Sequence, residues 1–305
     1  MIPPKTQTNR RPFAMMLMVV GSVVISFGGL IVRNIEMADA WQINIYRSIA
    51  FVSAILIVIA FEHRERTISR IRAVGFPGIW AGVILGIAGV AFMQALTTTT
   101  VANTTFTMCA IPFITAGLAR LFLKERLTNL TLIAMVLAAS GVVIMVVDGF
   151  MNMNVVGDGS VYGNFMAIIT AIGFAIFAIM VRANRHIDML PSLLVGGIFV
   201  IVVSLVVSFD DLAISWRDML LCFLLGGVVS GFGHWVFVIA SRYLLAAELT
   251  LFMLFEFALG PLWVWYFIGE TPTVLALTGG IIVIVSVVAR TLLEPKEKAG
   301  KNSGA

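Results

Sequence analysis

The chain has 305 residues, of which 60% are hydrophobic and 12% are charged. Soluble globular proteins carry about 25% charged residues, so this composition leaves too little polar surface to cover a soluble fold. The formal net charge of +4 does not indicate a nucleic-acid partner, because the basic residues stand in short clusters between apolar runs. The composition argues against soluble enzymes, nucleic-acid-binding modules and disordered proteins. It indicates a polytopic membrane protein, whose surroundings are the lipid bilayer.

Ten apolar runs are each long enough to cross a membrane as a helix, which takes about 20 residues. The runs are continuous rather than alternating, which favours helices over strands. The first run follows basic residues but has spanning length, so we expect an uncleaved first span rather than a signal peptide. The sequence therefore predicts an all-α protein with ten transmembrane helices, at residues 13–33, 41–61, 74–96, 100–122, 129–148, 160–183, 191–209, 217–241, 244–267 and 272–292.

The positions of the basic residues predict the orientation of these spans. If the segments between spans alternate across the membrane, 17 of the 20 Lys and Arg residues lie on the side of the N-terminus. Two lie on the opposite side, and Arg47 lies within a span. Loops rich in Lys and Arg face the cytoplasm. We therefore expect residues 1–12 and 293–305 to be cytoplasmic tails.

The chain also resembles itself when it is shifted by 145 residues. Each repeat would hold five spans, over residues 13–148 and 160–292. Because five is odd, the second copy would enter the membrane from the opposite side, and such inverted repeats are typical of alternating-access transporters. A duplicated passive channel is the alternative. The matched positions include Gly82 with Gly227, Gly86 with Gly231, and Glu125 with Glu270.

Residues 95–146 resemble the signature region of EamA-type proteins in the drug/metabolite transporter superfamily. The shared features are a threonine-rich helix opening (98–105), a mid-helix proline at Pro112, the Lys-Glu-Arg-Leu sequence at 124–127, and Gly141 in the next helix. The second copy matches more loosely, through Ala246, Ala247, Pro261 and residues 269–273.

The resemblance implies a two-fold pseudo-symmetric, ten-helix carrier in the bacterial inner membrane. It implies a central cavity lined mainly by the first, third, fourth, sixth, eighth and ninth spans, with the fifth and tenth serving in packing. It implies transport of small metabolites, often outward, without catalysis or a cofactor. We expect an exporter or facilitator of an amino acid, amine or organic cation. One chain would suffice to form a complete transport pathway, and the sequence leaves open whether the protein is a monomer or a dimer.

Ionisable groups inside spans are the first candidates for a binding site, because an intramembrane charge is functional by default. Glu256 lies near the middle of the ninth span and is a candidate proton carrier or partner for a cationic solute. The alternative is a neutral acid bonded to a neighbouring backbone group. Glu248, nearer the cytoplasmic end, would line an inner vestibule or contact Arg242. Neither is matched by an acid in the first copy.

Other candidates are polar or aromatic. His234 titrates near neutrality and would relay protons, unless it is a satisfied core histidine. Trp235 would supply an aromatic wall. Gln94, Asn103 and Thr104 would line the cavity or bond neighbouring helices. No cluster indicates a metal site. Ser230 lies four residues before His234, which only weakly suggests an intramembrane hydrolase.

Arg47 lies about two turns into the second span. It would bind a substrate carboxylate or gate the outer mouth of a pathway. The structural alternative is that it pairs with Asp39 or extends its side chain to the membrane surface. The sequence slightly favours the structural alternative, because the second span is peripheral in the resembled family.

Overall fold

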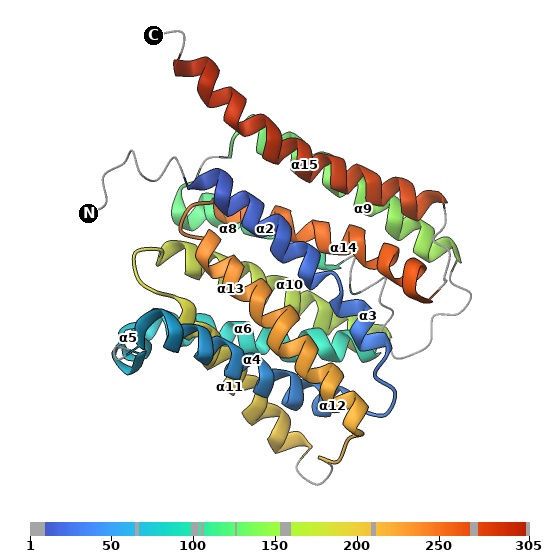
Figure 1. Cartoon of the computed structure of the whole chain (residues 1–305). Helices are drawn as coiled ribbons and strands as arrows, with labels where there is room; N and C mark the ends of the chain where they lie inside the picture. Colours follow the sequence, from blue (N-terminus) through green and yellow to red (C-terminus); the bar gives the residue numbers. More distant parts are fainter. Residues whose placement is uncertain are drawn as a thin grey trace.

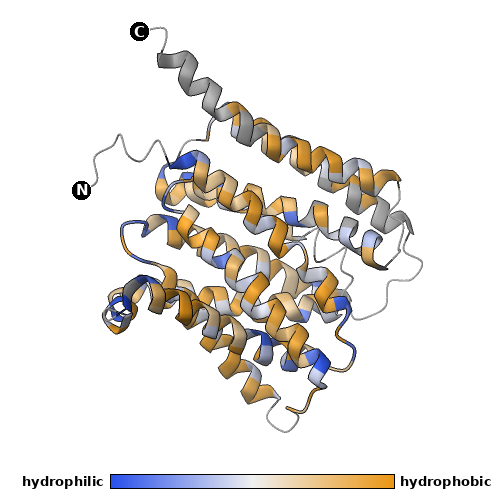
Figure 2. Cartoon of the chain, viewed as in Figure 1, coloured by the Kyte–Doolittle hydropathy of each residue, from blue (hydrophilic) through white to orange (hydrophobic). Residues whose placement is uncertain are grey.

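The computed structural model describes residues 10–64, 67–98, 104, 107–125, 127–152, 160–208, 212–268 and 274–302. The described residues are almost entirely helical and contain no strand. Hydrophobic residues make up most of the long helices (Figure 2). This is the pattern of helices that are buried on one side by protein and on the other by lipid.

Most helices of the first half of the chain follow the predicted spans. For the span predicted at 100–122, some of the first residues lie outside the described chain, and the helix begins at Ile111. A short polar helix, α5, was not predicted, and the first span is divided into α2 and α3. The elements are α2 (Arg11–Ile25), α3 (Gly28–Arg33), α4 (Ala40–His63), α5 (Thr67–Ala73), α6 (Gly75–Thr98), α8 (Ile111–Leu118), the π-helix η2 (Ala119–Leu123) and α9 (Asn129–Asn152).

The second half also follows the prediction, with two differences. The predicted helix over 217–241 is divided into α-helical, π-helical and α-helical parts, and the last helix continues to Asn302, beyond the predicted end at 292. The elements are α10 (Ser160–Ala183), α11 (Leu190–Val207), α12 (Trp216–Phe223), the π-helix η3 (Leu224–Ser230), α13 (Gly231–Ala240), α14 (Ala246–Ile268) and α15 (Val274–Asn302).

Six helical segments of the described chain are long and apolar enough to cross a membrane. They establish a multi-pass membrane protein. The other four predicted spans are occupied by α8 with η2, α9, α14 and α15, so the count of ten spans and the two inverted repeats stay predictions. The six segments are Arg11–Arg33, Ala40–Glu62, Gly75–Thr98, Val161–Ala183, Leu190–Val207 and Trp216–Ala240.

The helices form a bundle of roughly parallel and antiparallel rods (Figure 1). On one side, α9 and α15 pack along each other. On the other side, α6 packs against α10 and α11, and α11 packs against α4. Between these groups, α2 lies against α13 and α14. Helices from both ends of the chain, α2 and α14, thus lie next to each other between the two outer groups.

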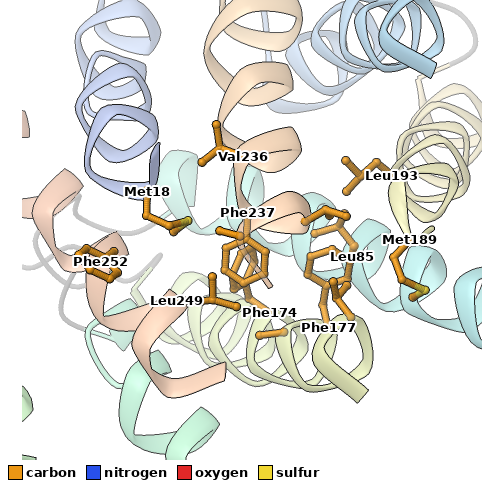
Figure 3. Packing of buried hydrophobic residues seen from close by; sticks show 14 of the residues in the cluster. Met18, Leu85, Phe174, Phe177, Met189, Leu193, Val236, Phe237, Leu249 and Phe252 are labelled. Atoms are coloured by element: carbon orange, nitrogen blue, oxygen red, sulfur yellow. The ribbon is translucent and has the colours of Figure 1, made fainter. Parts of the chain in front are cut away.

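An aromatic cluster fills part of the bundle interior. The rings of Phe174 and Phe177 on α10 lie 5.3 Å and 6.0 Å from that of Phe237 on α13. Figure 3 shows these rings with Met18, Leu85 and Leu249 around them. Phe177 is fully buried. The cluster therefore joins α10 and α13 beside the cavities described below.

The first pair of repeat-matched glycines, Gly82 and Gly86, allows α6 and α11 to approach closely. A Cβ at Gly82 would collide with the backbone oxygen of Ser192 on α11, and one at Gly86 would lie 2.6 Å from Phe199. In the second pair, added Cβ atoms would meet α4 at ordinary or slightly tight distances. The closest approach there occurs at Gly226 instead, where a Cβ would collide with the backbone oxygen of Arg47.

Candidate functional site

Glu256 lines a small cavity where α2, α10, α13 and α14 meet. The other lining residues are largely apolar, apart from Ser22 and His234. The hydroxyl of Ser22 donates to the backbone oxygen of Phe252, which occupies its proton. Within the described part of the chain, no hydrogen bond or ion pair reaches the Glu256 carboxylate. The carboxylate is therefore the principal polar group that this first cavity offers to a solute.

Arg47 lines a second cavity, between α4, α6, α11 and the η3–α13 segment. Ser48, Phe51, Ser230 and His234 also line it, and the glycines of α6 and α11 complete its wall. The first and second cavities have volumes of about 20 Å³ and about 50 Å³. About 10–15 Å³ is enough for one water, whereas small-molecule pockets hold roughly 300–1,000 Å³. These two cavities therefore admit water but not a metabolite in this conformation.

His234 borders both cavities. Its Nδ1 lies 2.9 Å from the backbone oxygen of Ser230. A carbonyl oxygen can only accept, so Nδ1 carries a proton and Nε2 holds the lone pair of the neutral ring. The contact does not involve the Ser230 hydroxyl, so these two residues do not form the serine–histidine pair of a hydrolase. His234 instead shares one cavity with Glu256 and the other with Arg47.

Arg47 does not pair with Asp39. The side chain of Asp39 accepts from the backbone N–H of Gln42 and caps the start of α4. Arg47 Nη2 donates to Asn44 Oδ1 at 3.0 Å, one turn earlier on the same helix. Its Nε is buried and has no acceptor within the described residues. The predicted pairing of Arg47 with Asp39 is therefore wrong.

Trp235 lies apart from the other candidates, in a third and largely apolar cavity of about 420 Å³ between α2, α4, η3 and α13. Its Nε1 is buried without a partner among the described residues. The next residue along the chain from His234 thus faces another side of α13. A contribution of Trp235 to the same solute site stays a prediction.

Glu248 is engaged with the protein rather than open to a cavity. It is 1% exposed, and both its oxygens accept from Arg11 Nη2, at 2.7 Å and 2.8 Å. The backbone N–H of Leu245 and the hydroxyl of Thr131 also donate to it, at 3.0 Å and 3.4 Å. The expected contact with Arg242 is wrong. These bonds favour a structural role for Glu248.

The remaining uncharged candidates are buried. Gln94 is 6% exposed, and its Nε2 has no partner within the described chain. Thr104 is fully buried and has a bonding partner. Neither borders the first or second cavity. Asn103 lies outside the described residues. Their participation in a binding site stays a prediction.

Two further ion pairs lie at the same end of the bundle as Arg11 and Glu248. Arg182, at the end of α10, donates Nε to Glu125 at 2.7 Å and Nη1 to the backbone oxygen of Ser241. Arg242 pairs with Asp188 at 2.9 Å. These partners are too far apart in the sequence for any local pattern to have indicated them. Together with the Arg11 pair, they tie the helix ends together on this side.

The family match follows the helices just described. Residues 12–147 match the EamA-like transporter family, which is part of the drug/metabolite transporter superfamily. The first half of the chain is EamA-like. The resemblance expected from residues 95–146 is thereby confirmed and extended back to α2. Members of the EamA-like family are membrane transporters of small molecules rather than enzymes.

The fold is shared with a protein of known crystal structure over most of both chains. The two structures superpose with a TM-score of 0.76, over 93% of this chain and 99% of the other, at 13% sequence identity. At that identity the likeness concerns the fold alone. No curated protein matches the sequence. The match over residues 12–147 suggests a membrane transporter of small molecules, and the substrate has to be argued from the cavities.

Proposed function

We propose that this protein carries a small metabolite across the bacterial inner membrane by alternating access. The observation that carries the proposal is Glu256, a carboxylate that lines a cavity between four helices without a protein partner among the described residues. Intramembrane carboxylates mark substrate or proton pathways. The solute would be an amino acid, an amine or an organic cation, and the protein would act as an exporter or facilitator with both termini in the cytoplasm.

The small volumes of the two cavities support alternating access over a passive channel. A channel at rest either holds a continuous pathway or closes it at one constriction. Here the polar groups lie in separate spaces of about 20 Å³ and about 50 Å³ within packed helices. A solute would enter only after helices separate on one side. The two five-helix repeats, at 13–148 and 160–292, would rock against each other to produce that opening.

Proton coupling is a separate part of the proposal, through Glu256 or His234. Both border the first cavity, and the lone pair of the His234 ring is free of the contact to Ser230. A proton bound by either group in one conformation and released in the other would couple solute movement to pH. A carrier without coupling would exchange solutes equally well at every pH.

Counterflow in proteoliposomes tests the proposal. Vesicles holding the purified protein would be loaded with a pool of amino acids, amines, organic cations and nucleosides, and mass spectrometry would identify the solutes that exchange. Saturable exchange of one chemical class is the expected result, with reduced exchange for Glu256→Gln. Flux that does not saturate, or single-channel currents, would show that the protein is a channel rather than a carrier. Empty liposomes and Arg120→Gln, at an exposed position on η2, are the controls.

A further inference from the structure

Arg47 is a cation inside the helix bundle for which the described residues supply no anion. Its guanidinium lines the second cavity, and none of the residues that line this cavity is Asp or Glu. Asp39 caps the start of α4, and Asp218 on α12 accepts from the backbone N–H groups of Glu36 and Met37. A charge in such a place is retained only where something compensates it.

Two buried donor nitrogens on one turn of α4 have no acceptor among the residues that the structure describes. Arg47 Nε and Asn44 Nδ2 are both buried without an acceptor within the described part of the chain. The two side chains belong to one turn of α4, and the single acceptor between them, Asn44 Oδ1, is already used by Arg47 Nη2. Buried donors are normally satisfied, so each exception calls for an explanation. An acceptor group in the second cavity, which Arg47 lines, would give the guanidinium the partner that it lacks among the described residues.

The cavity beside Arg47 has room for such a group. Its wall includes Gly89 on α6 and Gly196 and Gly197 on α11, which present no side chains. A Cβ at Gly89 would lie 3.8 Å from Arg47 Nη2, so any larger residue there would take up space next to the guanidinium. With about 50 Å³, the cavity holds more than one water. The guanidinium thus faces space that a ligand group can enter.

We propose that Arg47 binds the carboxylate group of the transported solute in this second cavity. The fork of a guanidinium matches the two oxygens of a carboxylate, and such charge-assisted pairs are the strongest hydrogen bonds in proteins. A monoanionic group matches the single unpaired cation, whereas a phosphate dianion would need a second one. The proposal rests on the carrier function above and narrows its substrate class to solutes that bear a carboxylate.

Matched sets of solutes test the proposal. Each set shares one side chain and differs in charged groups, because the amine lacks the carboxylate of the amino acid and the acid lacks its amino group. The sets are alanine, ethylamine and propionate; leucine, isoamylamine and 4-methylpentanoate; phenylalanine, phenethylamine and 3-phenylpropionate. Counterflow would be measured for wild type, Arg47→Gln, Arg47→Lys and Arg120→Gln. Gel filtration would check that each variant is monodisperse. The shift in unfolding temperature that each solute causes in detergent would be measured in parallel, as a readout of binding without transport.

The expected result is that solutes with a carboxylate exchange and the matched amines do not. Arg47→Gln would raise the half-saturating concentration of the carboxylates by about 10- to 100-fold. Arg47→Lys keeps the charge but loses the fork, so it would give a smaller increase and serves if the Gln variant does not fold. Arg120→Gln would behave as wild type.

Three outcomes would overturn the proposal. The first is exchange of amines alone, which would leave the carrier function standing. The second is exchange of carboxylates that Arg47→Gln and Arg47→Lys leave unchanged. The third is no exchange and no thermal shift with any carboxylate. Absence of exchange with a carboxylate-induced thermal shift that Arg47→Gln abolishes would support the Arg47 site and refute the carrier function.

Discussion

Arg11 donates one nitrogen, Nη2, to both carboxylate oxygens of Glu248, and this contact joins α2 to α14 across 237 residues of sequence. Glu248 is 1% exposed and receives two more donors, from Leu245 and Thr131. Glu256, on the same helix, has no such donor among the described residues. The two acids of α14 therefore differ in kind: one holds helices together, and the other is available to a solute or a proton.

Removing Arg11 should destabilise the fold strongly. Arg11→Gln would leave the Glu248 carboxylate buried without its cation, which costs about 3–5 kcal/mol in known cases. The free energy of unfolding in detergent micelles measures the effect. Arg217→Gln is the matched control, because the Arg217–Glu36 pair is exposed, at 58% and 65% of the side-chain surfaces. Exposed pairs contribute about 0–1 kcal/mol. Equal losses in the two variants would contradict a locking role for Arg11.

Glu256→Gln should reduce transport without loss of stability. The carboxylate has no described partner to lose, and the amide has nearly the same shape. Solute exchange would fall, and any pH dependence that Glu256 causes would disappear. Glu248→Gln should instead lower the stability of the fold, because it removes the carboxylate that pairs with Arg11. Unfolding temperature and counterflow at several pH values, measured on both variants, separate the two roles. A stability loss in Glu256→Gln as large as that in Glu248→Gln would argue against them.

Arg182→Lys should behave as a disruptive change. Arg182 uses two nitrogens on two partners, Glu125 and the backbone oxygen of Ser241, and it is 7% exposed. An ammonium group has no rigid fork and would satisfy at most one of these acceptors well. We expect a loss of roughly 1–3 kcal/mol in unfolding free energy, the usual cost of an unsatisfied buried group. Arg185→Lys, at an exposed site, should leave the unfolding free energy unchanged within about 0.5 kcal/mol.

Gly226→Ala should destabilise the protein although alanine favours helices. An added methyl group would collide with the backbone of Arg47 on α4. Gly227→Ala is the matched control, since its methyl group would meet Ala50 at an ordinary 3.6 Å. There the usual gain of roughly 0.5–1 kcal/mol for replacing a helical glycine should be retained. Thermal unfolding of the two variants would differ in sign. If both were stabilised, the close approach of η3 to α4 would be refuted.

Most helices were predictable from the sequence because their signal is a local run of apolar residues. The break between α2 and α3 was not, although Ser26 and Phe27 explain it in retrospect. Trp263 donates Nε1 to Ser26 Oγ at 2.7 Å, and its ring stacks on Phe27 at 4.3 Å. A contact across 237 residues stabilises a local irregularity there. No property of residues 13–33 alone indicates it.

The sequence was enough to identify the ionisable residues of the candidate site, but it did not identify the residues that contact them. A charge within an apolar run identified Arg47, His234 and Glu256, and the structure brings all three to two cavities that share His234. Proximity in sequence suggested partners for Glu248 and Arg47 that were wrong, because ion pairs inside a bundle join different helices. The inverted repeat, which would explain the layout, stays a prediction.

The π-helical segment η3 sets the direction in which His234 points. A π-helical turn contains one more residue than an α-helical turn, so the helix that follows is turned by about 100° from the course of a continuous α-helix. His234 stands four residues after η3, and it borders the two cavities in that rotated setting. Conversion of η3 to an α-helix would turn α13 about its own axis, so the imidazole could leave Arg47 and Glu256 without any helix tilting or sliding.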